Sequence, residues 1–119
     1  MKEKKVYSLM IGRYQPLHAG HIKLIQSVLD EGKNVCVAIR NTMKDESNPY
    51  NYDERLFMFI AEFKDEMLDG TVKVIKIPDI DEVCHGRKVG WGIRVISLDK
   101  ETEQISATKI RESRNVETD

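Results

Sequence analysis

The sequence predicts an α/β domain built on a parallel sheet, and two kinds of segment carry this prediction. Short apolar runs at residues 6–11, 34–39 and 71–77 are expected to be buried strands. Longer segments at 21–29 and 53–68 carry apolar residues at helical spacing. Strands that alternate with helices along a chain are typical of βαβ units, in which neighbouring strands are parallel.

The first half of the chain is expected to form one βαβ unit. Gly12 ends the first strand, and Gly32 stands where a helix normally stops. The strand at 34–39 is apolar without alternation, which is typical of a parallel strand covered on both faces. The helix between these strands has Ile22, Ile25, Val28 and Leu29 at helical spacing.

The second half continues the pattern. Gly70 follows the second helix, and Pro78 stops the third strand. A fourth strand is expected at 93–98, where apolar and polar residues alternate as in a half-exposed strand. The apolar face of the second helix consists of Leu56, Phe59, Ile60, Phe63 and Met67. The expected fold is a small Rossmann-like domain over 1–119, with a parallel sheet of four to five strands and helices on both faces.

The composition argues against several classes of protein. The chain has 19 basic and 20 acidic residues, and this balance does not favour a nucleic-acid partner. The apolar run before Gly12 is too short for a signal peptide or a membrane span. Cys36 and Cys84 form no CxxC pair and are expected to be buried free thiols. These features together predict a cytoplasmic protein.

Residues 12–21, Gly-Arg-Tyr-Gln-Pro-Leu-His-Ala-Gly-His, form the most informative segment. They join the first strand to the first helix, and the first turn of a helix offers N–H groups and a positive dipole end to an anion. His18 and His21 are three residues apart and are expected to converge on one ligand. A zinc site would need further ligands, and no second close pair of His or Cys accompanies these two, so no metal site is expected.

This segment resembles the G-x-F-x-P-x-H-x-G-H signature of the HxGH nucleotidyltransferase superfamily. Tyr14 stands where Phe is usual, and the other matching positions are Gly12, Pro16, His18, Gly20 and His21. The resemblance implies transfer of a nucleoside monophosphate from a nucleoside triphosphate to a phosphorylated small molecule, with release of pyrophosphate. It implies catalytic roles for His18 and His21 and nucleotide-binding roles for Gly12, Arg13, Tyr14 and Gly20.

A second motif lies near the C-terminus, at residues 104–111. Ser106 or Thr108 is suited to cap a short helix, and Arg111 follows one turn later with a forked guanidinium. The segment resembles the I-S-S/G-T-x-I-R motif of the same superfamily. By that resemblance Ser106 and Thr108 bind the β- and γ-phosphates, and Arg111 joins the catalytic group.

The nucleotide stays open between ATP and CTP. Residues 48–55 resemble the N-P-F-x-x-x-E-R segment of archaeal-type nicotinamide-nucleotide adenylyltransferases, and Arg13 and Gln15 match the first motif of that branch. The chain length and the His-Ile-Lys-Leu helix start are similar to those of glycerol-3-phosphate cytidylyltransferases. Class I aminoacyl-tRNA synthetases use related motifs, but 119 residues leave no room for tRNA recognition.

Three cations are candidates for binding the acceptor phosphate: Lys44, Arg55 and Arg87. Arg55 lies in a first helical turn, where a cation opposes the macrodipole and so indicates an anionic partner. Arg87 is close to Trp91, for which a structural role is favoured. Magnesium is implied because it bridges triphosphate oxygens. Relatives are commonly dimers, so a homodimer is possible, and the alternative function is a non-catalytic nucleotide-binding or sensing module.

Overall fold

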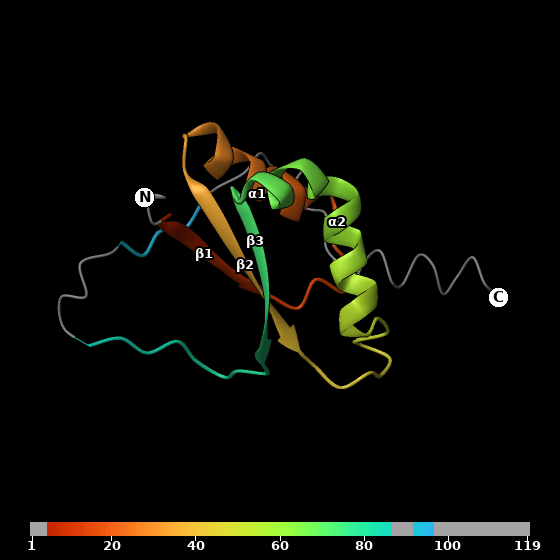
Figure 1. Ribbon diagram of the computed structural model, residues 1–119. Helices are drawn as coiled ribbons and strands as arrows, with labels where there is room; N and C mark the ends of the chain where they lie inside the picture. The colour runs from red at the N-terminus through yellow and green to blue at the C-terminus, as the bar shows by residue number, and fades with distance from the viewer. Residues whose placement is uncertain (1–4, 87–91, 97–119) are drawn as a thin grey trace.

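The computed structural model describes residues 5–86 and 92–96 (Figure 1). Its elements lie where the sequence predicts them, with ends that differ by at most two residues. They are β1 (Tyr7–Gly12), α1 (Ala19–Asp30), β2 (Asn34–Asn41), α2 (Tyr52–Asp69) and β3 (Val72–Pro78).

The three strands form one parallel sheet in the order β1-β2-β3. The register of β1 on β2 runs from the pair Tyr7 and Asn34 to the pair Gly12 and Ile39. Helix α1 connects β1 to β2, and α2 connects β2 to β3, so the chain makes two successive βαβ units. This confirms the predicted α/β class and the parallel sheet.

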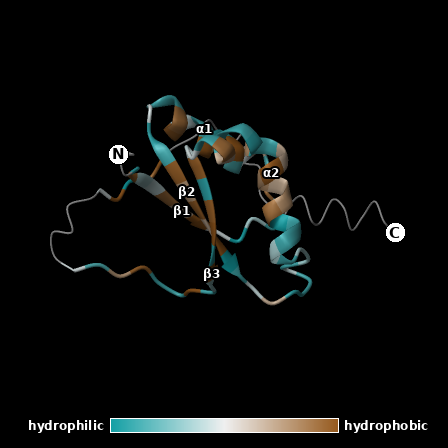
Figure 2. Ribbon diagram, in the orientation of Figure 1, coloured by the Kyte–Doolittle hydropathy of each residue, from teal (hydrophilic) through white to brown (hydrophobic). Residues whose placement is uncertain are grey.

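Both helices pack against the same face of this sheet (Figure 2). Two right-handed crossovers that move in the same direction along a sheet place their helices on one side. The expected helix on the opposite face is not among the described residues, and Leu9 of β1 is 58% exposed. The core between helices and strands consists of Tyr14, Ile25, Val28, Val35, Val37, Ile39, Phe59, Phe63 and Val72.

A polar cap fixes where α2 begins, and a glycine marks where it ends. The Asn51 side chain accepts a hydrogen bond from the Glu54 N–H at 2.8 Å, and the Glu54 carboxylate accepts one from the Asn51 N–H at 3.1 Å. This reciprocal capping box satisfies two backbone donors that a helix start otherwise leaves free. At the other end Gly70 has a φ of 85°, a conformation that favours glycine.

The segment expected to contain the fourth strand is described only at residues 92–96, which do not form a strand. Ile96 packs against the core, and Arg94 forms two hydrogen bonds to the Glu31 carboxylate, at 2.7 and 2.9 Å. Glu31 follows α1 and precedes β2, so this ion pair lies at the amino ends of the strands.

Two further expectations concern the cysteines and the membrane. Cys36 and Cys84 are both free thiols, but only Cys36 is partly buried, because Cys84 lies in an exposed stretch after β3. Among the described residues, no helix combines the length and the apolar character that crossing a membrane requires.

Candidate active site

The turn after β1 is shaped by the packing of Tyr14 on Gly12. Tyr14 has a φ of 52°, which turns the chain sharply and brings its ring back over the end of the strand. A Cβ atom on Gly12 would lie 3.0 Å from the Tyr14 ring, closer than ordinary van der Waals contact. A side chain at position 12 would have to displace the Tyr14 ring, so this packing favours glycine there.

The Tyr14 ring in turn supports His21. It is 5% exposed and contacts the rings of His21 and Phe59 edge-on, with centroids 4.7 and 4.9 Å away. Burial also raises the pKa of the Tyr14 hydroxyl. The ring faces the protein interior, so it positions His21, whereas a direct contact of Tyr14 with a nucleotide stays a prediction that this burial does not favour.

His18 and His21 cap the start of α1 reciprocally. His18 Nδ1 accepts hydrogen bonds from the backbone N–H groups of Gly20 and His21, at 3.0 and 3.4 Å. His21 Nδ1 accepts one from the His18 N–H at 3.2 Å. The two rings stack with centroids 3.7 Å apart and planes 19° from parallel. The pair therefore forms a capping box in which histidines take both positions.

These hydrogen bonds assign one tautomer to both rings. Because each Nδ1 accepts a hydrogen bond, the proton of each neutral imidazole is on Nε2. Burial lowers the pKa of His18, and burial together with the charge of His18 lowers the pKa of His21 to about 4. Both rings are thus neutral near pH 7, and each presents an Nε2–H donor away from the helix backbone.

This arrangement corrects one expectation about the helix start. The sequence predicts that free backbone N–H groups of the first turn hold an anion, but those of Gly20 and His21 already donate to His18. The two imidazole Nε2–H groups are further donors for a ligand. The positive end of the helix dipole lies behind them and still favours an anion.

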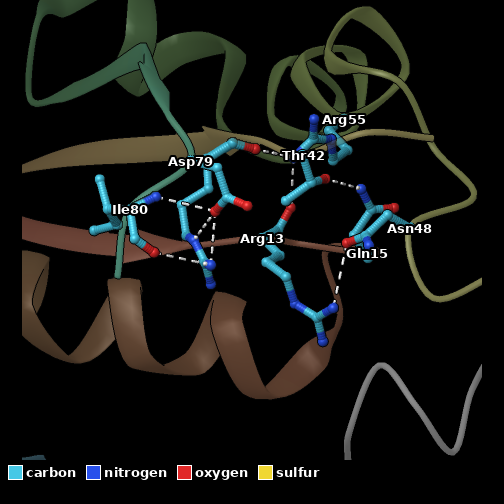
Figure 3. Close-up of polar contacts among 8 residues, drawn as sticks. Arg13, Gln15, Thr42, Asn48, Arg55, Asp79 and Ile80 are labelled. Carbon is cyan, nitrogen blue, oxygen red and sulfur yellow. Dashed lines mark hydrogen bonds and ion pairs between the residues drawn. The ribbon is translucent and has the colours of Figure 1, made fainter. Parts of the chain in front are cut away.

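Residues 42–51, the loop between β2 and α2, are joined to the β1–α1 turn by polar contacts (Figure 3). The buried Gln15 amide pairs with the Tyr50 backbone, donating to its carbonyl at 2.9 Å and accepting from its N–H at 3.0 Å. Arg13 Nη1 donates to Asn48 Oδ1 at 3.2 Å. Both loops leave carboxyl ends of parallel strands, where ligands of such sheets bind.

The acceptor candidates differ in where the structure places them. The Lys44 side chain is 65% exposed, and its Nζ lies 3.8 Å from the Glu54 carboxylate, so it is accessible beside the site. Arg55 is 0% exposed and donates to backbone carbonyls instead of facing solvent. The contact of Arg55 with an acceptor phosphate is therefore replaced by a structural contact. Arg87, Ser106, Thr108 and Arg111 lie outside the described residues, so their roles stay predictions.

Three further polar residues shape this edge of the sheet, through contacts that the sequence did not predict. Gln15 and Asn48 hold the two loops together, as described above. Arg40 at the end of β2 donates to Asp79 Oδ1 at 2.7 Å and to the Ile80 carbonyl at 3.3 Å, just after β3. Besides the motif matches of Gln15 and Asn48, their positions near the ends of consecutive strands are a signal, because the carboxyl ends of parallel strands meet at one edge.

Within residues 5–86 and 92–96, no three His, Cys, Asp or Glu side chains are grouped as a metal site requires.

Comparison with known proteins identifies the family. The cytidylyltransferase-like family matches residues 9–69, just over half of the chain. The chain belongs to the cytidylyltransferase-like family. The match covers β1 from Leu9 onward, both helices and β2, and so includes the histidine pair and the loop beside it. The predicted membership of the HxGH nucleotidyltransferase superfamily is confirmed.

Curated relatives of this cytidylyltransferase-like chain are adenylyltransferases. It is 31% identical over 78 residues to the nicotinamide-nucleotide adenylyltransferase of Pyrococcus horikoshii, covering 64% of this chain and 42% of that protein. It is 34% identical over 76 residues to the Methanococcus aeolicus protein of the same name, covering 62% of this chain and 43% of that protein. The Acinetobacter baylyi nicotinamide/nicotinic acid mononucleotide adenylyltransferase is 34% identical over 62 residues, which cover 50% of this chain and 33% of that protein. The chain thus spans less than half the length of these relatives.

Proposed function

We propose that this chain is a nucleotidyltransferase that moves a nucleoside monophosphate from a nucleoside triphosphate to a phosphorylated small molecule and releases pyrophosphate. The observation that carries the proposal is the stacked pair of neutral imidazoles at the start of α1, His18 and His21, with both Nε2–H donors directed away from the backbone. Membership of the cytidylyltransferase-like family supports the same reaction class.

In the proposed step, an oxygen of the acceptor phosphate attacks the α-phosphorus of the triphosphate. The bond from the α-phosphorus to the bridging oxygen of the β-phosphate breaks, and pyrophosphate leaves with that oxygen. The reaction needs alignment and dispersal of negative charge more than covalent participation by the protein. No proton has to be removed from an ionised acceptor phosphate, which suits a site whose central histidines are donors.

The two imidazoles supply preorganised donors for this charge. Their Nε2–H groups would bind the α-phosphoryl oxygens and strengthen those bonds as negative charge accumulates. A neutral donor gives up no proton during the step, so each ring keeps the same tautomer throughout. Lys44 is the accessible cation on the neighbouring loop for the acceptor phosphate. Ser106, Thr108 and Arg111 are proposed to hold the leaving pyrophosphate, and Arg87 is a second candidate for the acceptor.

Magnesium is proposed to arrive with the triphosphate. When bound, it would neutralise charge on the phosphate oxygens, with water completing its coordination. The lack of a metal-ligand cluster among the described residues is compatible with an ion held chiefly by the substrate.

ATP and a nucleotide-type acceptor form the first substrate pair to examine. The relatives named above are nicotinamide-nucleotide adenylyltransferases, and the segment at 48–55 resembles the one typical of that branch. CTP with glycerol 3-phosphate is the second candidate, supported by the family's description as cytidylyltransferase-like.

A pyrophosphate-release assay tests the proposal directly. The protein is incubated with magnesium and either ATP or CTP, each with nicotinamide mononucleotide or glycerol 3-phosphate, and the product is identified by mass spectrometry. Release that requires both substrates, and that falls at least about a hundredfold in His21→Gln, is the expected result. A triphosphate that raises the melting temperature without any release would identify a non-catalytic nucleotide-binding module. The proposal fails if there is neither release nor binding.

A further inference from the structure

Arg55 is the most unusual side chain of the described residues outside the histidine pair. It lies in the first turn of α2, carries a charge and is nevertheless 0% exposed. Charged side chains are almost never fully buried unless they are paired. Its role must therefore be sought in the groups that surround it.

Those groups are backbone carbonyls from three different segments, and Figure 3 shows the contact with Arg13 among them. A single nitrogen, Nη1, donates to the carbonyls of Arg13 at 2.8 Å and Arg40 at 2.7 Å. Nε donates to the Asn51 carbonyl at 3.2 Å, at the start of the same helix. The guanidinium thus connects the ends of β1 and β2 with the beginning of α2.

The position of these carbonyls explains what the contact does. The last residues that pair β1 with β2 are Gly12 and Ile39, so Arg13 and Arg40 are each one residue beyond the pair. At this point the chain turns away from the sheet, because Tyr14 adopts a positive φ. Arg55 Nη1 therefore joins the segments that follow Gly12 and Ile39, just beyond the point where β1 and β2 stop pairing.

None of these three acceptors is a carboxylate that would balance the charge of Arg55. All three are neutral carbonyls, and Nη2 is buried without a hydrogen-bond partner within residues 5–86 and 92–96. Burial lowers the pKa of the guanidinium, although an arginine remains protonated in proteins. Burying such a cation is unfavourable, and its planar fork is what lets one side chain reach three carbonyls.

We propose that Arg55 is a positioning residue, whose buried guanidinium fixes the Arg13 carbonyl and thereby the turn that carries Tyr14 and the two histidines. The link is short: Arg13 is bonded to Tyr14, and the Tyr14 ring lies edge-on to His21. Arg55 itself does not contact the substrates. Its effect on turnover rests on the proposed function, whereas its effect on the histidine pair does not.

The test compares Arg55→Lys with Arg94→Lys. Lysine at position 55 keeps the positive charge but cannot reach the Arg13, Arg40 and Asn51 carbonyls together. The control removes an arginine fork as well, but from the exposed ion pair with Glu31 at the opposite ends of the strands. The side-chain titration of His21 is followed by NMR in the absence of nucleotide, and kcat and KM are measured with the substrate pair that the wild type uses.

In the wild type and in Arg94→Lys, His21 is expected to titrate with a pKa of about 4, with His18 and Tyr14 as its titratable neighbours. In Arg55→Lys its pKa should rise toward 6.5, because a released Tyr14 leaves the ring more hydrated. kcat should fall at least about tenfold while KM changes less than about threefold, since the donors are displaced but remain present.

An unchanged His21 titration in a folded Arg55→Lys protein overturns the proposal. A shifted titration with unchanged kcat overturns its catalytic consequence. If the protein transfers no nucleotide at all, the proposed function fails but the titration still decides the positioning role. If Arg55→Lys does not fold, hydrogen exchange in the wild type decides. Guanidinium hydrogens of Arg55 that exchange as fast as those of Arg94 contradict the positioning role, and much slower exchange supports it.

Discussion

The substitution His21→Gln separates the structural role of this histidine from its proposed chemical role. Glutamine at the third position of a helix is an ordinary capping-box partner, because its side-chain oxygen accepts a hydrogen bond from the N-cap backbone N–H. The variant should therefore keep the bond from the His18 N–H that His21 Nδ1 accepts at 3.2 Å. It loses the titratable ring and the Nε2–H donor.

The pH dependence of the free energy of unfolding measures how strongly the folded protein favours the neutral form of His21. The pKa of His21 is about 4 in the folded protein, and its ordinary value is 6.5. The unfolded chain thus takes up a proton at a higher pH than the folded protein does. The stabilisation from this group is complete above pH 6.5 and is lost as the pH falls toward 4. At about 1.4 kcal/mol per pH unit this amounts to about 3 kcal/mol, and partial solvent exposure reduces it to about 2 kcal/mol.

Urea unfolding followed by circular dichroism at about pH 7.5 and pH 4.5 measures this difference. Protonation of carboxylates destabilises both proteins similarly, so the wild type should lose about 2 kcal/mol more than His21→Gln between the two pH values. Equal losses in the two proteins would show that His21 is not held neutral by its surroundings. The reasoning from tautomer to Nε2–H donor would then be refuted.

Three further predictions concern other candidate site residues. Gly12→Ala should lower the melting temperature by several degrees and reduce turnover, because the new Cβ would lie 3.0 Å from the Tyr14 ring. A melting curve that overlays that of the wild type would contradict this packing. His18→Asn should keep the N-cap and cost less than about 1 kcal/mol in urea unfolding, yet lower kcat about a hundredfold or more, and near-normal kcat would argue against the imidazole as a donor. Arg111→Lys should leave the melting temperature unchanged but weaken pyrophosphate inhibition about tenfold, since lysine cannot form a forked contact, and unaltered inhibition would exclude Arg111 from the pyrophosphate site.

The sequence located the turn of the candidate site because its signals are local. A strand ending in glycine, followed by two histidines three apart at a helix start, is recognisable without knowledge of distant contacts. The reciprocal cap was also within reach of sequence reasoning, since its two partners occupy the spacing of a capping box. The usual capping box pairs Ser or Thr with Glu or Gln, so two histidines at this spacing do not by themselves predict one.

Arg55 shows where local reasoning fails. Its place in the first helical turn predicts a contact with an anion, yet it lies four and eight residues before Phe59 and Phe63, on the buried side. The helical spacing alone therefore indicates that Arg55 lies on the buried face of α2. The partners were not predictable, because the carbonyls of Arg13 and Arg40 are 42 and 15 residues away in the chain.

The amino-acid sequence by itself determined the order and type of the elements, the parallel sheet and the position of the histidine pair. These follow from hydrophobic periodicity, turn residues and a motif, all of which act over a few neighbouring residues. Only the tertiary structure decided that the imidazoles are neutral Nε2–H donors, that Tyr14 supports His21, and that Gln15 and Arg55 join separate loops. Burial and long-range hydrogen bonds depend on which segments come into contact when the chain folds, and no local sequence pattern specifies those contacts.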